Sequence, residues 1–167
     1  MPFAPLLALL ACDTSESACD EAANTTPSLD VGTGETAWEP LADGDRVGWS
    51  YGSQGGRHIY VSLQAVGIAQ GWTDSLADPN NPIVTIVLID DTPTDPAYPE
   101  VAGLYDYPHF FRPNTEGTLE TLGDQVVGTG TAWEEIGDID GTLRATLVDT
   151  CGTELTAERQ VTVTETP

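Results

Sequence analysis

The chain has 167 residues, of which 27 are Asp or Glu and only five are Arg or Lys, so its net charge at neutral pH is −22. Nucleic acids and anionic membrane surfaces carry charge of the same sign, which argues against both as partners. The length suits one domain, and 40% hydrophobic residues supply enough apolar material for a core. With 17 Gly and 12 Pro, the composition favours short strands joined by turns over long helices.

The chain begins with an apolar segment that ends at a cysteine. Residues 3–11 are all apolar, and a run of this length is too short to span a bilayer but suits the core of an export signal. The stretch Leu9-Leu10-Ala11-Cys12 resembles the lipobox of bacterial lipoproteins. The resemblance implies cleavage before Cys12 and attachment of lipid to it, so that acyl chains hold the protein on a membrane. No basic residue precedes Cys12, and the alternative is an apolar first strand with an incidental cysteine.

The segment after Cys12 is small, polar and acidic over residues 13–28. Such a segment buries too little apolar surface to offset the entropy lost on ordering. We therefore expect three parts, namely a signal peptide over residues 1–11, a lipidated cysteine with a flexible acidic tether over residues 12–28, and a folded domain over residues 29–167.

The three cysteines agree with export. If Cys12 carries lipid, Cys19 and Cys151 remain as an even pair in an oxidising compartment, and we expect a disulfide between them. The alternatives are two free thiols, or a bond between Cys12 and Cys19 in a chain without lipid.

Apolar residues alternate with polar ones along most of the remaining chain. Residues 58–66 place Ile and Val on one face and polar side chains on the other, where we expect His58 at the surface. Residues 83–89 are apolar on both faces, as in a central strand, and residues 143–148 and 161–164 alternate again. Asp-Gly and Gly-Gly turns separate such runs, so the sequence predicts an all-β fold, a single immunoglobulin-like antiparallel β-sandwich of about seven to nine strands.

Two segments resemble known families. Residues 140–152, continued by residues 159–163, resemble the last two strands of immunoglobulin-like and PKD-like domains, with Leu143 at a position where those domains often have tyrosine. Residues 31–45 and 51–59 resemble the V-G-T-G-E-x-A-[FW]-x-P-L-x-D-G-D and Y-G-x-Q-G-G-x-H-I segments of uncharacterised lipoproteins of myxobacteria-like Gram-negative bacteria. The second resemblance implies membrane anchoring and a sandwich fold, and it brings no activity.

Motifs typical of enzymes lack the context that catalysis needs. Residues 48–52 fit the G-x-S-x-G elbow of α/β-hydrolases, but a glycine turn and a strand follow, where that fold requires a helix. Glu134 and Glu135 are adjacent, so in a strand they point to opposite faces and do not flank one glycosidic bond. His58 and His109 belong to no zinc-binding motif.

Calcium is the metal that suits the acidic composition best, because it binds carboxylate oxygens. Asp90, Asp91 and Asp95 follow the predicted central strand and are candidate ligands, and the alternative is a solvated loop. An EF-hand with its glycine at Gly141 fails, because its first and twelfth positions are Ile136 and Leu147. We expect no other cofactor.

An aromatic segment over residues 105–111 is the candidate ligand-binding surface. As a strand it would place Tyr105, Tyr107, His109 and Phe111 on one face, where the rings could stack on a sugar or a protein partner. Pro108 would then require an edge strand or a bulge. We favour the other interpretation, in which these rings pack in the core.

The sequence therefore predicts an exported lipoprotein of the outer or cytoplasmic membrane, facing the periplasm or the cell exterior. We expect a monomeric binding or structural module without catalytic activity, held on the membrane by lipid on Cys12, with an envelope protein or glycan as its unknown partner and no nucleic acid. A calcium-binding accessory domain or an envelope hydrolase is the alternative.

Overall fold

The computed structural model of the chain describes residues 14–52, 56–72, 75–129 and 138–165. Within these ranges it has one helix and ten strands. In chain order they are α1 (Thr14–Ala23), β1 (Ser28–Thr33), β2 (Glu39–Pro40), β3 (Asp45–Tyr51), β4 (Arg57–Val66), β5 (Ile83–Asp90), β6 (Glu100–Pro108), β7 (Arg112–Pro113), β8 (Leu119–Gly128), β9 (Ile139–Val148) and β10 (Glu154–Glu165).

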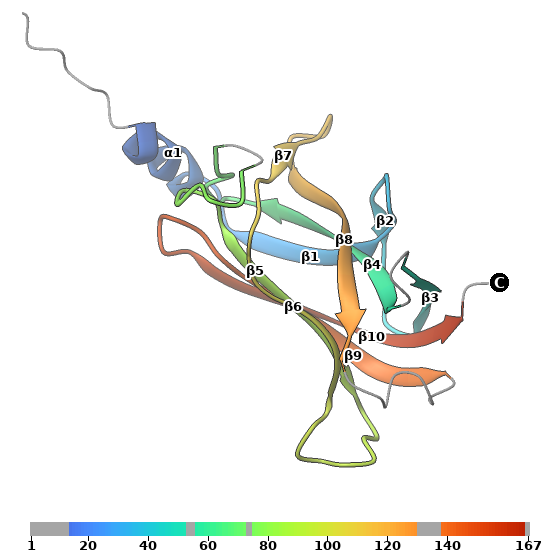
Figure 1. Ribbon diagram of the computed structural model, residues 1–167. Coiled ribbons are helices and arrows are strands. Elements are labelled where there is room, and N and C mark those ends of the chain that lie inside the picture. The colour runs from blue at the N-terminus through green and yellow to red at the C-terminus, as the bar shows by residue number, and fades with distance from the viewer. Residues whose placement is uncertain (1–13, 53–55, 73–74, 130–137, 166–167) are drawn as a thin grey trace, which may run out of the picture.

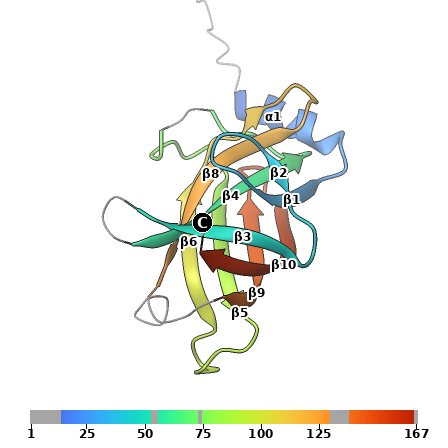
Figure 2. The same ribbon diagram turned by 90° about the vertical axis from the view of Figure 1, so that its right-hand side faces the viewer.

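Seven of the strands close into a ring of hydrogen-bonded pairs. The order is β4-β3-β10-β9-β5-β6-β8, and β8 pairs back to β4. Neighbours in the ring are antiparallel, except that β3 runs parallel to β10. β1 pairs with the second half of β4, beyond the part that β3 occupies (Figures 1 and 2). The expected all-β class is confirmed, and the strands form a barrel-like closure.

The core is the inner face of these strands, and the alternation in the sequence accounts for it. Along β4, Ile59, Val61 and Leu63 are fully buried, and along β9 Leu143 and Leu147 are too. Because side chains of a strand alternate between faces, each of these runs lines one side of its strand with aliphatic groups. One connected apolar cluster fills the ring.

Part of the outer face of β4 is also buried, which corrects the expected surface position of His58. His58 is 4% exposed and Ser62 is 0% exposed. The Ser62 hydroxyl donates to the Gly34 carbonyl at 2.9 Å and accepts from the Gly123 amide at 3.2 Å. Chain segments far away in the sequence therefore cover this face, and alternation within β4 alone does not reveal such a cover.

Helix α1 corrects the expected tether. Residues 14–23 are helical, and β1 begins at Ser28, so most of the segment predicted to be structureless is part of the folded body. The expected disulfide between Cys19 and Cys151 is present, with the two Cα atoms 5.6 Å apart, and it fastens α1 to the turn between β9 and β10. This crosslink and the burial of Ala22 offset the ordering entropy that we had expected to keep the segment disordered.

Candidate functional site

A β-bulge divides the aromatic segment 105–111. β5 and β6 pair at Val84 with Tyr107 and at Ile86 with Leu104, so two residues of β6 lie opposite one residue of β5. Asp106 has a positive φ of 47°, and its amide donates to the Thr85 hydroxyl at 3.1 Å. The bulge interrupts the alternation, and the rings of the segment therefore differ in exposure.

Phe111 belongs to the core, whereas Tyr105 lies outside. Phe111 is 0% exposed, so it is not available to stack on a ligand. Tyr105 is 48% exposed, and its ring lies against Gly103, where a Cβ atom would come within 2.2 Å of it. The Tyr105 hydroxyl donates to Glu100 at 3.1 Å, and partial burial together with this carboxylate raises the pKa of Tyr105.

Tyr107 and His109 connect the surface to the core. The ring centroids of Tyr107 and His109 are 5.6 Å apart, and those of His109 and Phe111 are 6.0 Å apart, both in edge contacts. This row of rings lies where the pairing of β6 with β8 ends, since only Ala102 and Gly103 of β6 pair with β8. We refer to the gap beyond these pairs, at Tyr107 and His109, as the seam.

An ion pair between His109 and Asp124 bridges the seam. His109 Nε2 lies 2.7 Å from Asp124 Oδ1, and the other oxygen of this buried carboxylate accepts from the Thr121 hydroxyl at 2.8 Å. His109 Nδ1 lies 3.3 Å from the Phe110 carbonyl. Both ring nitrogens face acceptors, so the doubly protonated imidazolium satisfies both. Burial lowers the pKa of His109, but Asp124 and the Phe110 carbonyl outweigh burial and nearby Arg112, and the pKa is raised.

Two hollows flank His109 and share His109, Phe110 and Arg112 as lining residues. The smaller has a volume of about 190 Å³ and reaches Thr121 and Leu122. The larger has a volume of about 250 Å³ and reaches Leu76 and Tyr107, and none of its described lining residues is acidic. On a chain of charge −22, a hollow with one guanidinium, one imidazole and a tyrosine ring differs from most of the surface. It suits binding of a small group, because ring faces stack and Arg112 supplies hydrogen-bond donors.

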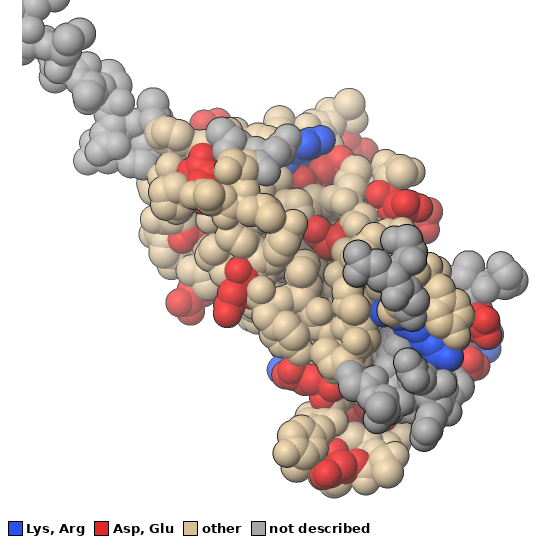
Figure 3. All heavy atoms as spheres, viewed as in Figure 1, with Lys and Arg blue, Asp and Glu red and all other residues tan. Residues whose placement is uncertain are grey.

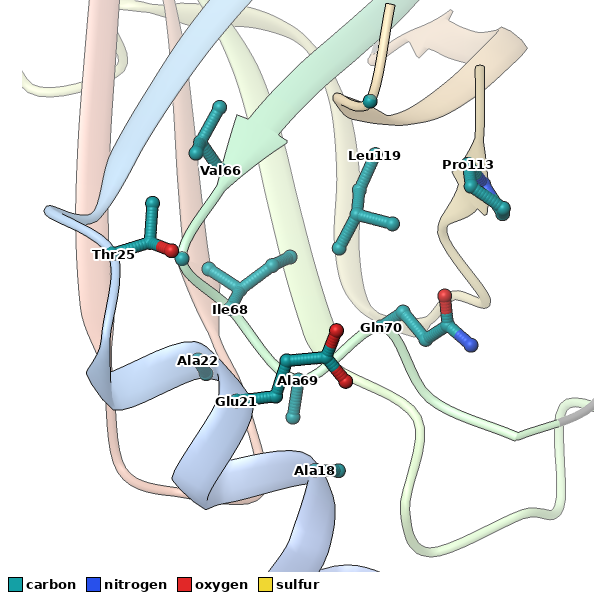
Figure 4. A pocket seen from close by; sticks show the side chains of 12 residues that line it. Ala18, Glu21, Ala22, Thr25, Val66, Ile68, Ala69, Gln70, Pro113 and Leu119 are labelled. Atoms are coloured by element: carbon teal, nitrogen blue, oxygen red, sulfur yellow. The ribbon is translucent and has the colours of Figure 1, made fainter. Parts of the chain in front are cut away.

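A third hollow lies beneath α1 and has a volume of about 480 Å³. Figure 4 shows Ala18 and Ala22 on the helix side, Ile68 and Leu119 across from them, and the Glu21 carboxylate at the rim. This hollow was missed by sequence reasoning, because it exists only once α1 is folded against the barrel.

Ser50 of the G-x-S-x-G stretch meets His58 without forming a catalytic triad. The Ser50 hydroxyl lies 3.3 Å from His58 Nε2, because Ser50 of β3 and His58 of β4 are direct partners across the sheet. In the described part of the chain, no carboxylate is hydrogen-bonded to His58. Strand β4 begins at Arg57, so the strand-to-helix elbow of a hydrolase does not occur between β3 and β4.

Each aspartate proposed as a calcium ligand already accepts a hydrogen bond, Asp90 and Asp95 from their own loop and Asp91 from β9. Asp90 accepts from the Thr92 amide at 2.8 Å, Asp95 from the Ala97 amide at 3.0 Å, and Asp91 from the Thr142 hydroxyl at 3.1 Å. Among the residues that the structure describes, no three His, Cys, Asp or Glu side chains gather in a group that could hold a metal ion.

Three of the residues singled out in the sequence, Cys12, Glu134 and Glu135, lie outside the described residues, as does the predicted signal peptide. Across the described ranges, no helix is long and apolar enough to cross a membrane. In comparisons with known proteins, no family model and no curated protein matches the chain.

Proposed function

We propose that the protein is an exported, lipid-anchored module of the cell envelope that binds a partner and does not catalyse a reaction. The observation that carries this proposal is the disulfide between Cys19 and Cys151, because such bonds persist in oxidising compartments and are rare in the cytosol. With these two cysteines paired, Cys12 is the third, and it stands in the lipobox-like stretch where a lipoprotein carries its lipid. The membrane would be the outer or the cytoplasmic one.

The strand pairings support an immunoglobulin-like sandwich within the barrel-like closure. β1, β4 and β8 would form one layer, and β3, β10, β9, β5 and β6 the other. The first part of the chain would cross between the layers, since β1 pairs with β4 and β3 pairs with β10. Arg159 of β10 ties the layers further, through an ion pair with Asp30 and a hydrogen bond of 2.9 Å to the Leu41 carbonyl.

The hollow between Tyr107 and Arg112 is our candidate for the ligand site. An envelope glycan or a protein segment could stack on Tyr107 and bond to Arg112. Figure 3 shows Asp and Glu side chains spread over the visible face from the α1 end to the opposite end, so acidic ligands are disfavoured over most of that face. A closed ring of strands leaves little free edge for pairing with another chain, which supports a monomer.

The anchor is tested by fractionating cells that make the full chain with Cys12→Ser. We expect the wild-type protein in the membrane fraction with lipid on Cys12 by mass spectrometry, and the variant in the soluble fraction. Cys19→Ser is the matched control, because it removes a cysteine but leaves the anchor, and it should stay with membranes. Membrane association of Cys12→Ser equal to that of the wild type would refute the proposal.

Binding is tested with purified cell-wall glycan as the probe. Tyr107→Ala should weaken retention of the protein on the glycan about tenfold, as expected when a ring that stacks on a ligand is removed. Tyr98→Ala is the control, because Tyr98 is 78% exposed on the loop between β5 and β6, away from the seam. Equal retention of the two variants would exclude the seam as the glycan site.

A further inference from the structure

The segment that links the anchor to the folded body is much shorter than a tether over residues 12–28 would be. α1 begins at Thr14, two chain steps after Cys12, and two steps span at most about 7 Å. A flexible coil of 16 residues would instead separate its ends by about 22 Å. The disulfide at Cys19 and the buried Ala22 hold α1 against the barrel, so the helix does not extend the tether.

We propose that the α1 end of the barrel rests on the phospholipid headgroup layer, with Trp72 and Leu76 in the interface. The proposal rests on the lipid anchor at Cys12 proposed above. A lipid on that cysteine keeps Thr14, the first residue of α1, within about 7 Å of the anchor, which brings the neighbouring surface close to the membrane.

The loop between β4 and β5 belongs to the same end of the molecule as α1. The Ala69 amide donates to Asp149 at 2.8 Å, and Asp149 precedes the disulfide-bonded Cys151 by two residues. Ile68 and Ala69 also form the wall of the hollow that faces α1. Both ribbon views place the loop beside the helix (Figures 1 and 2).

Two large apolar side chains of this loop are exposed. Trp72 is 45% exposed and Leu76 is 56% exposed. Asn81, which is buried, fixes the loop by accepting from the Trp72 amide and donating to the Ser75 carbonyl, both at 3.1 Å. Tryptophan is enriched where hydrocarbon meets headgroups, because its ring is apolar and its N–H is polar.

The negative charge at the α1 end determines which lipid headgroups this surface can approach. Asp20 and Glu21 of α1 are exposed and add two negative charges to this end of the molecule. Anionic lipids repel such a surface, whereas zwitterionic lipids do not. The membrane surface that fits is therefore zwitterionic, and anionic lipid should loosen the contact even though the anchor remains.

The test uses the lipidated full chain in phosphatidylcholine vesicles that contain brominated phosphatidylcholine, which quenches tryptophan in contact with it. We expect quenching of the wild-type emission, and at least a threefold smaller quenched fraction in Trp72→Phe. Trp38→Phe is the matched control and should keep the wild-type quenching, because Trp38 packs over Gly32, at the end of β1 far from α1. Replacing half of the lipid with phosphatidylglycerol should reduce the quenching.

Each other outcome has a separate meaning. Lipidated protein whose emission is unquenched, or is quenched equally in Trp72→Phe, overturns the docking while leaving the anchor intact. Stronger quenching with phosphatidylglycerol also overturns it. A mass spectrum without lipid on Cys12 overturns the anchor, and the docking falls with it.

Discussion

His109 and Asp124 join two parts of the molecule where the backbone pairing between β6 and β8 has ended, through a contact of 2.7 Å. Asp124 is 8% exposed, and its second oxygen is taken by Thr121. At the seam, a hydrogen bond between two charged side chains therefore takes the place of backbone hydrogen bonds. Because His109 titrates, the stability of this part of the fold depends on pH.

Stability should decrease as the pH rises above neutrality, because the pKa of His109 in the folded protein is raised above its ordinary value of 6.5. A raised histidine pKa contributes stability that is fully present below pH 6.5 and is lost as the pH passes through the folded pKa. Asp124→Asn should lower the free energy of unfolding by about 1–3 kcal/mol at acidic pH and by less at alkaline pH. Thermal unfolding from about pH 5 to about pH 9 measures both effects.

The control for this experiment is Glu154→Gln, which removes an exposed carboxylate of β10, three strands away from β6 and the seam. It should shift the melting temperature equally at all pH values in that range. A difference between Asp124→Asn and the wild type that stays constant or grows toward alkaline pH would contradict the role of His109.

The disulfide should contribute much of the stability, because it joins residues separated by 132 positions. The chain-entropy model gives about 5 kcal/mol for a loop of this length, as an upper limit. We expect Cys19→Ala to lower the urea midpoint strongly and to release α1, seen as fast amide exchange across Ala18 and Ala22. Cys151→Ala should have the same effect, and the double variant should add nothing further. Full protection of α1 without the bond would show that packing alone holds the helix.

The sequence predicts the features that depend on local pattern. The alternation along β9 placed Leu143 and Leu147 inside, and cysteine arithmetic paired Cys19 with Cys151. What it missed depends on contacts between distant segments. Helix α1 is stable because of a crosslink to the turn after β9, and His58 is buried although its neighbours suggest an outer face.

The candidate site shows the same division. The aromatic segment was recognisable as an unusual cluster, but the bulge at Asp106 decides which rings are exposed. Predicting a bulge at this position requires the register of β6 against β5. The sequence of β6 alone does not specify that register. The pairing of His109 with Asp124 likewise depends on where β6 leaves β8.

Asp149 should be among the most sensitive polar residues. It is 5% exposed, and its carboxylate accepts from the amides of Ala69, Cys151 and Thr153 at 2.8–2.9 Å. Hydrogen bonds to a charged acceptor are stronger than neutral ones, so Asp149→Ala should cost about 3 kcal/mol or more in urea unfolding. Asp95→Ala, which removes an exposed carboxylate with one amide partner, should cost less than about 1 kcal/mol. Similar costs for the two variants would contradict this account.

Gly123 and Gly117 form a matched pair that separates backbone strain from steric overlap. Both have positive φ values, 71° and 83°, so alanine is strained at either position by about 1–2 kcal/mol. A Cβ atom at Gly117 meets nothing within 4 Å, whereas one at Gly123 would lie 2.4 Å from the Glu35 carbonyl oxygen. Backbone does not yield as a flexible side chain does, so Gly123→Ala should destabilise the protein by at least about 2 kcal/mol more than Gly117→Ala. Equal urea midpoints would show that the segment at Glu35 moves away freely. That segment would then not be held firmly against the outer face of β4.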